Sequence, residues 1–361
     1  MAGKVSHNDL PNIRLERAKS WLAGKPQGPV FLEIFPTAAC NLDCLFCWRQ
    51  VFKGQALPPE LSDARLNKLA DEAVELGVLE VCVKGGGEPL LRRAFIEHAA
   101  KAFARGGVLA QLITNGTLFD DNLCSLLVDM GWDDVALSVD AADPQIHDRL
   151  RAASGAFERT MRAAEDFRRI KRSARAALPL VSMHCVLTNT NYLQPGKMLE
   201  LAARHEMSHV LFDSMGLGAP ACEGLKMSEQ QLDEFDSHID EWEEQARKLA
   251  IHTNLSSFRK KGSAARQAPD CAQEKGKPFC HLLWHQLSVR EDGGLLPCCT
   301  AANFNNPLKL GSMSLREAWF SAPLEALRRG MLEGKAPSFC RSCHDLFRRE
   351  NSAVLEGLRA S

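Results

Sequence analysis

The sequence predicts a protein of the α/β class, and two observations lead to this prediction. First, short apolar stretches alternate with longer helical patterns between residues 30 and 250. Second, the alternation repeats six times, and repeated strand–helix units are typical of a parallel sheet with crossover helices. A complete TIM barrel has eight such units, so we expect a partial (β/α)6 TIM-like barrel.

Six short apolar stretches predict the strands of this sheet, and a helical pattern follows each of them. The strands are expected at Val30–Phe35, Leu79–Lys84, Val108–Thr114, Asp134–Val139, Leu180–Leu187 and His209–Phe212. The helices are expected at Ser62–Leu76, Ala94–Gly106, Asp120–Gly131, Ala156–Arg172, Gly196–His205 and Ser228–Leu249. In such a sheet, catalytic and binding groups gather where the carboxyl ends of the strands meet the following loops. Motifs at these ends are therefore the candidates for function.

The remaining chain divides around this barrel core, which we place at residues 30–250. Residues 1–29 form an N-terminal extension. Residues 251–277 include a stretch rich in Ser, Lys, Gly and Ala and are expected to be a linker. Residues 278–361 hold five cysteines, a D-G-G turn and a helical pattern at Ser314–Leu327. We expect this last segment to form a small second domain.

The composition is that of a globular protein, with 45% apolar and 25% charged residues. The 361 residues include 44 Lys or Arg and 45 Asp or Glu, so the formal net charge is −1. This balance argues against nucleic-acid binding through a broad basic field. No apolar run approaches the roughly 18 residues that cross a bilayer, and the N-terminus lacks the apolar core of a secretory signal. We therefore expect a cytoplasmic protein without a membrane segment.

Cysteine is unusually frequent, with 13 in the chain. In a long cytosolic protein such residues are more often ligands of a metal or a cluster than disulfide partners. The odd number also excludes complete intramolecular pairing. The grouping of the thiols along the chain is therefore the main guide to function.

Three cysteines directly follow the first predicted strand, in the segment A-A-C-N-L-D-C-L-F-C-W. Cys40, Cys44 and Cys47 form a C-x3-C-x2-C pattern, whose thiolates can converge on one metal centre. A structural zinc site needs a fourth ligand, but no other Cys or His lies within about thirty residues. An iron–sulfur cubane normally takes four cysteines, so three would leave one iron open to an outside ligand.

This segment resembles the cluster-binding loop of the radical S-adenosylmethionine (SAM) enzymes. The resemblance implies that SAM chelates the open iron and that electron transfer cleaves SAM to a 5′-deoxyadenosyl radical, which abstracts hydrogen from a substrate. The second strand ends in K-G-G-G-E-P, and the resemblance implies that Gly86, Gly87 and Glu88 contact the methionine amino group. By itself such a glycine run is equally typical of a tight turn.

The resemblance continues at the ends of the next three strands. It implies that Asn115 in T-N-G, Ser138 and Asp140 in A-L-S-V-D, and Asn189 in L-T-N-T-N contact SAM or the substrate. Period-two geometry places Ser138 and Asp140 on the same side of their strand. Arg151, in I-H-D-R-L-R, matches the arginine that binds the SAM carboxylate. A solvated position on a helix is the alternative for this arginine.

A second group of cysteines lies near the C-terminus. Four thiolates, from Cys280, Cys298, Cys340 and Cys343, can complete a cluster or a zinc site without an open position. The D-G-G turn predicts a hairpin that brings Cys280 and Cys298 toward each other. Beside the first motif, this region resembles the small twitch (SPASM-like) cluster-binding domain of radical SAM enzymes, which implies one auxiliary 4Fe–4S cluster. Cys299 is adjacent to a ligand and is left without a role.

The organisation of the chain resembles that of twitch-type dehydrogenases of aminocyclitols, such as 2-deoxy-scyllo-inosamine. This resemblance implies a biosynthetic radical SAM oxidoreductase that acts on a small polar substrate, with SAM and two 4Fe–4S clusters as cofactors. The auxiliary cluster would accept an electron from the substrate radical. An external one-electron donor, a flavodoxin or a ferredoxin, is also implied.

Three alternatives remain open at this point. A maturase would modify the side chain of a peptide or a protein. An epimerase would use Cys222, in the loop after the last predicted strand, as a hydrogen-atom donor. A metal-binding scaffold would have no activity toward SAM. The sequence does not identify the substrate or the carbon that is attacked.

Overall fold

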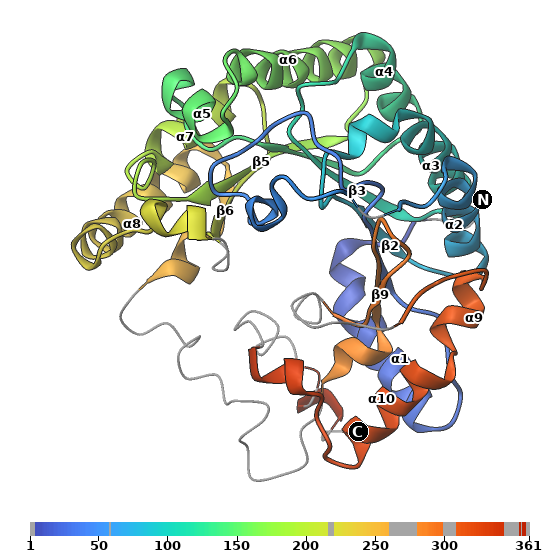
Figure 1. Ribbon diagram of the computed structural model, residues 1–361. Coiled ribbons are helices and arrows are strands. Elements are labelled where there is room, and N and C mark those ends of the chain that lie inside the picture. The colour runs from blue at the N-terminus through green and yellow to red at the C-terminus, as the bar shows by residue number, and fades with distance from the viewer. Residues whose placement is uncertain are drawn as a thin grey trace.

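The computed structural model describes residues 4–57, 59–215, 220–259, 280–298, 308–342, 354 and 356–358. Its centre is a curved sheet with the strand order β7-β6-β5-β4-β3-β2-β1-β8-β9, and the helices from α2 to α8 lie along its outer side (Figure 1). This open, largely parallel arrangement confirms the predicted α/β fold with a partial barrel. No described helix is long and apolar enough to cross a membrane.

All six predicted strands and the helices that follow them are present within a few residues of their expected positions. The strands are β1 (Phe31–Ile34), β2 (Glu80–Val83), β3 (Leu109–Thr114), β4 (Asp134–Ser138), β5 (Leu180–Leu187), β6 (His209–Ser214), β7 (His252–Thr253), β8 (Gln286–Val289) and β9 (Leu295–Leu296). The helices are α1 (Leu10–Leu22), α2 (Asp63–Glu75), α3 (Arg93–Gly106), α4 (Asp121–Asp129), α5 (Pro144–Arg151), α6 (Ala156–Ala174), α7 (Pro195–Arg204), α8 (Glu229–Leu249), α9 (Leu315–Trp319) and α10 (Ala322–Leu332).

Local signals in the sequence explain where these helices begin and end. The Ser62 hydroxyl accepts a hydrogen bond from the Arg65 backbone N–H at the start of α2, and Asp120 caps α4 in the same way. Such side-chain caps satisfy backbone donors that have no partner inside the helix. At the C-terminal end of α3, Gly107 adopts a left-handed conformation with φ of 65°, which glycine tolerates without steric cost.

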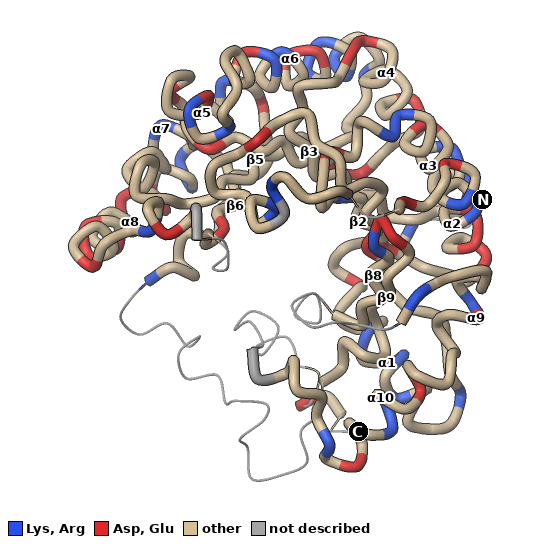
Figure 2. The backbone as a smooth tube through the Cα atoms, viewed as in Figure 1, with Lys and Arg blue, Asp and Glu red and all other residues tan. Residues whose placement is uncertain are grey.

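The parallel register brings the carboxyl ends of neighbouring strands side by side. Ile34 pairs with Val83 across β1 and β2, and Leu112 pairs with Val83 across β2 and β3. The strands are buried on both faces, as expected for a parallel sheet covered by helices. The loops that follow β1 to β5 therefore converge on one edge of the sheet. Figure 2 shows that acidic and basic residues are interspersed along the outer helices, in keeping with the net charge of −1.

The C-terminal region continues the barrel sheet, which the sequence did not predict. β8 runs parallel to β1, with Ile34 opposite Val289, and β9 returns antiparallel to β8. The predicted hairpin between Cys280 and Cys298 is thus confirmed. β7 lies within residues 251–277, where we expected a linker, and extends the other end of the sheet.

Two predictions about helices need correction. The pattern at Ser314–Leu327 is divided between α9 and α10, because a new helix with a proline in its first turn begins after Ser321. In addition, α5 was not predicted from the sequence. Its start signals were present, since the Asp143 side chain accepts hydrogen bonds from two backbone N–H groups and Pro144 is the first helical residue.

The N-terminal helix and the C-terminal region are joined by a buried cation. The Arg328 guanidinium on α10 lies over the rings of Trp21 and Trp319, at 4.7 and 4.1 Å from the ring centroids. It donates hydrogen bonds to the Leu283 and Trp319 carbonyl oxygens, both at 2.9 Å. Burial lowers the pKa of Arg328 to about 10, since the charge is largely removed from water.

Candidate functional site

A cavity of about 730 Å³ opens at the carboxyl edge of the sheet. The loop after β1 forms much of its wall, and residues at the ends of β2, β3 and β4, together with Arg151 of α5, form the opposite side. The turn between β8 and β9 contributes Arg290, Glu291 and Asp292. This is the edge at which parallel α/β proteins place their functional groups.

Three thiols of the loop after β1 line this cavity. Cys44 is buried, whereas Cys40 and Cys47 are half-buried. Backbone hydrogen bonds hold the loop, from Leu45 N–H to the Leu150 carbonyl at 2.9 Å and from Cys47 N–H to the Cys44 carbonyl at 3.2 Å. Burial raises the pKa of Cys40 and raises that of Cys44 to about 11, because a buried thiolate is poorly solvated; for Cys44 this effect outweighs the opposing effect of the Arg151 charge.

The three cysteines suit a cluster better than a single metal ion. Within the described part of the chain, no three Cys, His, Asp or Glu side chains converge on one ion. A cubane places its ligands on different irons, so its thiolates are farther apart than those around one metal. Among the described residues lining the cavity there is no fourth cysteine and no histidine. The donor set therefore fits a cluster with one open iron.

The G-G-G-E-P turn after β2 lies directly against the start of the cysteine loop. Gly87 N–H donates to the Thr37 carbonyl at 2.9 Å, and Glu88 N–H donates to the Ala39 carbonyl at 2.8 Å. A Cβ on Gly87 would lie 1.8 Å from the Ala39 carbonyl oxygen, so only glycine permits this approach. The run of glycines thus forms a turn and also allows the loops after β1 and β2 to approach each other closely.

Glu88 joins the ends of β2 and β3 from a buried position. Its carboxylate accepts hydrogen bonds from the Leu90 N–H at 3.0 Å, the Thr114 hydroxyl at 2.5 Å and the Asn115 N–H at 2.9 Å. Burial raises the pKa of Glu88 against the opposing effect of these donors. The Asn115 side chain donates to Asn41 at 2.9 Å, which ties the end of β3 to the cysteine loop.

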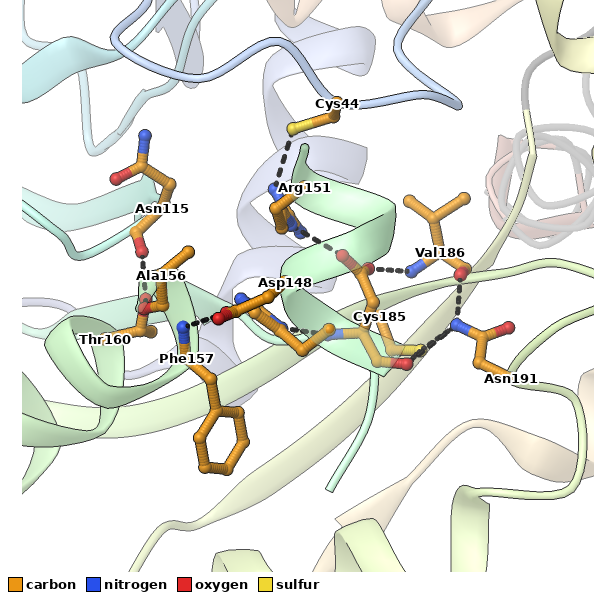
Figure 3. A network of polar contacts seen from close by, with 12 residues as sticks. Cys44, Asn115, Asp148, Arg151, Ala156, Phe157, Thr160, Cys185, Val186 and Asn191 are labelled. Atoms are coloured by element: carbon orange, nitrogen blue, oxygen red, sulfur yellow. Dashed lines mark hydrogen bonds and ion pairs between the residues drawn. The ribbon is translucent and has the colours of Figure 1, made fainter. Parts of the chain in front are cut away.

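A chain of polar contacts leads from the end of β4 to the cysteine loop (Figure 3). Arg151 Nε donates to Asp140 Oδ2 at 2.6 Å, and Arg151 Nη1 lies 3.8 Å from Cys44 Sγ. Both members of the ion pair are buried. Asp140 in turn accepts from the Val186 N–H at 3.0 Å, so the pair also joins β4 to β5. The solvated helix position considered for Arg151 is therefore wrong.

The structure brings most of the predicted site residues together. The cavity is lined by Cys40, Cys44, Cys47, Gly86, Gly87, Glu88, Asn115, Ser138 and Arg151. Asp140 does not line it, although it was expected on the same side as Ser138, because its side chain turns to Arg151 and the β5 backbone. Asn189 is also outside the lining, and its side-chain amide donates to the Gly224 carbonyl at 2.9 Å.

Cys222, the proposed hydrogen-atom donor, is buried behind the cysteine loop. Its thiol is directed to the Leu45 carbonyl oxygen at 3.8 Å, and the residue packs in an apolar group with Phe46 and Leu150. Cys222 is not among the residues that line the cavity. This placement disfavours the epimerase alternative, since a donor must reach the substrate radical.

The predicted auxiliary ligands gather beside the β8–β9 hairpin. Cys280 packs against the apolar group that contains Cys298, and Cys280 and Cys340 both pack against the group formed by Leu283, Trp284 and Met331. Cys343, the fourth predicted ligand, and Cys299 lie outside the described residues. The three described thiols therefore share one region of the fold.

The sequence analysis missed the charged residues of the cavity wall formed by β2 and β8. Lys84 pairs with Glu33, and Arg290 donates to Glu291 at 3.0 Å. The Glu291 carboxylate is buried, with Oε2 at 3.7 Å from the position of a Cβ on Gly86. The only signal was the D-G-G turn, which predicted a hairpin but not its contact with the cavity.

Comparisons with known proteins agree with this geometry. A model of the Radical SAM superfamily matches residues 34–202, and a model of the SPASM iron–sulfur cluster-binding domain matches residues 280–344. The PqqA peptide cyclase of Methylocella silvestris is 29% identical over 324 residues, which cover 87% of this chain and 80% of that protein. The PqqA peptide cyclase of Granulibacter bethesdensis is 28% identical, covering 85% of this chain and 77% of that protein.

Two solved structures share the fold. Streptococcus suis SuiB bound to S-adenosylmethionine superposes with a TM-score of 0.66 and 17% identity, covering 95% of this chain and 78% of that one. The enzyme anSMEcpe with bound SAM superposes with a TM-score of 0.59 and 17% identity, covering 92% and 95%. The chain thus combines a radical SAM domain with an iron–sulfur cluster-binding domain, and it is a radical SAM enzyme whose cofactors are SAM and two 4Fe–4S clusters.

Proposed function

We propose that this radical SAM enzyme modifies a peptide, by removing hydrogen from one of its residues. The observation that carries this proposal is the similarity to PqqA peptide cyclases, which extends through both domains over 85–88% of the chain. It favours the peptide-maturase alternative over the sugar or aminocyclitol substrate predicted from the sequence. PqqA itself is the substrate of those relatives and serves here as the first peptide to test.

In this proposal the residues around the cavity hold the first cluster and SAM. Cys40, Cys44 and Cys47 are the cluster ligands, and Gly87 keeps the G-G-G-E-P turn close to them. SAM bound at this cluster supplies a 5′-deoxyadenosyl radical when one electron arrives from an external flavodoxin or ferredoxin. Arg151 provides a guanidinium for the SAM carboxylate, as implied by the resemblance.

Further polar groups complete the proposed SAM site. Asn115 and Ser138 face the cavity from the ends of β3 and β4. Gly86 and Glu88 flank Gly87 in the turn, and the buried Glu88 carboxylate fixes the turn to β3. Asp140 acts through Arg151, and Asn189 fixes the loop after β5. The positions and hydrogen bonds of these residues support the roles proposed for them.

The C-terminal cysteines are proposed to hold the auxiliary cluster and to complete the electron balance. Cys280, Cys298, Cys340 and Cys343 supply four thiolates, which leave no iron open. A cluster held by these residues would supply an acceptor for one electron. With one hydrogen atom going to the 5′-deoxyadenosyl radical, one electron to this cluster and one proton to solvent, the substrate would lose two electrons and two hydrogens in total.

The rim of the cavity suits a peptide. Trp48 and Leu57 line the cavity, and these residues are 47% and 50% exposed. Large exposed apolar side chains beside a cleft are typical of binding surfaces for other chains. Arg290 adds a positive charge to the cavity wall, and its side chain is 32% exposed.

The proposal is tested with anaerobically reconstituted enzyme, SAM and a low-potential reductant. The substrates are synthetic PqqA of Methylocella silvestris, peptides encoded beside the gene, and 2-deoxy-scyllo-inosamine. We expect 5′-deoxyadenosine together with a peptide lighter by two hydrogens in mass spectrometry. In Cys340→Ala the peptide product should disappear while 5′-deoxyadenosine persists. Oxidation of the aminocyclitol without any peptide product would contradict the proposal.

A further inference from the structure

The Arg151 guanidinium lies between a carboxylate and a cluster ligand. Its Nε is 2.6 Å from Asp140 Oδ2, and its Nη1 is 3.8 Å from Cys44 Sγ, within hydrogen-bonding distance for sulfur. Figure 3 shows the arginine reaching from the end of α5 toward the cysteine loop. The Arg151 side chain is 9% exposed and that of Asp140 is fully buried, so water screens this contact little.

Several hydrogen bonds hold Asp140 in place, and its carboxylate therefore holds the Arg151 side chain in place. Its second carboxylate oxygen accepts from the Val186 N–H at 3.0 Å. Its backbone N–H donates to His147 Nδ1 at 3.2 Å, and its carbonyl accepts from Asn191 Nδ2 at 2.7 Å. Arg151 also lies 5.2 Å from the centroid of the Phe46 ring. Asp140 and Phe46 thus fix the position of the guanidinium.

A fixed cation beside a cluster ligand affects the reduction of the cluster. Reduction adds negative charge to the irons and sulfurs, and a nearby positive charge with an N–H directed at a ligand sulfur stabilises that charge. Hydrogen bonds to the sulfurs, net charge and solvent exposure are the features through which proteins set cluster potentials. Low local screening strengthens the effect.

We propose that Arg151 raises the reduction potential of the first cluster through its contact with Cys44 Sγ, and that Asp140 is the positioning residue for this contact. The effect is separate from binding of the SAM carboxylate, because it acts on Cys44 Sγ and not on SAM. It is also independent of the substrate, so it stands whether or not the enzyme acts on a peptide. A less negative potential would make reduction of the cluster by a given donor more favourable.

The test is a redox titration of the reconstituted full-length enzyme, monitored by electron paramagnetic resonance in the absence of SAM. The signal of the first cluster is identified afterwards by its change when SAM is added. In Arg151→Gln we expect the midpoint potential of this signal to become more negative. A roughly tenfold less favourable reduction equilibrium corresponds to about 59 mV for a one-electron couple.

Two further variants separate this effect from loss of folding or of bulk charge. Arg151→Lys keeps the charge, but one ammonium cannot pair with Asp140 and contact Cys44 as a planar fork does. We expect Arg151→Lys to shift the midpoint potential in the same direction by a smaller amount. This variant also provides the measurement if Arg151→Gln fails to load a cluster. Arg149, two residues earlier on α5, is exposed, and Arg149→Gln should leave the potential unchanged.

The outcomes decide the proposal directly. A negative shift in Arg151→Gln or Arg151→Lys that Arg149→Gln lacks supports it. Unchanged potentials in both Arg151 variants would overturn it, even if SAM binding were weaker. An equal shift in Arg149→Gln would also overturn it, since the effect would then arise from surface charge and not from the contact with Cys44.

Discussion

At the scale of single residues, His147 shows how burial around the cavity creates a dependence on pH. The side chain is fully buried, and its Nδ1 accepts the Asp140 N–H, which assigns the proton of the neutral ring to Nε2. Nε2 has no partner among the described residues. Burial, followed by the nearby Arg151 charge, lowers the pKa of His147 to about 4.

This histidine should make the folded enzyme sensitive to acid. Below pH 6.5 the unfolded chain binds a proton that the folded chain takes up only near pH 4, so the free energy of unfolding decreases as the pH falls through this window. The full effect is about 3 kcal/mol, from 1.36 kcal/mol per pKa unit. In His147→Asn, Oδ1 can replace Nδ1 as hydrogen-bond acceptor without titrating. The free energy of unfolding, measured with urea at several pH values, should therefore depend less steeply on pH in this variant.

The matched control for this prediction is His238 on α8, whose side chain is 41% exposed. His238→Asn should leave the dependence of stability on pH as it is in the parent enzyme. If the free energy of unfolding of His147→Asn depended on pH between 6.5 and 4 as steeply as that of the parent enzyme, His147 would not be the cause of the acid sensitivity.

At the scale of elements, the G-G-G-E-P turn makes a contact with the cysteine loop that only glycine allows. Gly87 packs against backbone atoms of Ala39, whereas Gly86 faces the Trp48 ring, where a Cβ would lie at an ordinary 3.6 Å. Of these two neighbouring glycines, packing therefore requires only Gly87 to be glycine. The distinction follows from the loop after β1, which approaches Gly87 with its backbone and Gly86 with the Trp48 side chain.

The two glycines predict opposite results for the same substitution. In Gly87→Ala the cysteine loop must shift, because the clash is with backbone and not with a flexible side chain. We expect this variant to lose iron at the first cluster, measured as iron content and as the signal that responds to SAM. Gly86→Ala should load the cluster normally. Equal iron content in both variants would contradict this account.

At the scale of the whole molecule, the N- and C-terminal regions form one structure with the barrel. β8 pairs with β1, and the buried Arg328 links α10 to Trp21 of α1 and to the Leu283 carbonyl, three residues after Cys280. The segment that carries Cys280, the first of the proposed auxiliary ligands, is therefore anchored by the sheet on one side and by this arginine on the other.

Loss of this anchor should destabilise the whole molecule. Arg328→Ala removes two hydrogen bonds to carbonyl oxygens and the contacts with two indole rings, and we expect the free energy of unfolding to fall by about 3 kcal/mol. Arg329, the next residue, is exposed, so Arg329→Ala is the control and should change stability little. Thermal and urea unfolding measure both. Equal stability of the two variants would show that Arg328 is not an anchor.

The sequence by itself determined the order of strands and helices, the cysteine pattern after β1 and the motifs at the strand ends. These features are local: hydrophobic periodicity depends on neighbouring residues, and cluster ligands on one loop are set by short spacings. Because parallel strands end at the same edge, Cys44, Gly87 and Asn115 could be assigned to one site before their contacts were seen. Arg151 was added to this site by the resemblance to radical SAM enzymes.

Only the tertiary structure decided the contacts between distant segments. It joined β8 to β1, brought Arg290 and Glu291 to the cavity, and turned Asp140 away from the cavity to hold Arg151. It also placed Cys222 behind the cysteine loop. The physical reason is that strand pairing and burial of charge depend on contacts between residues of separate elements, which no local pattern records.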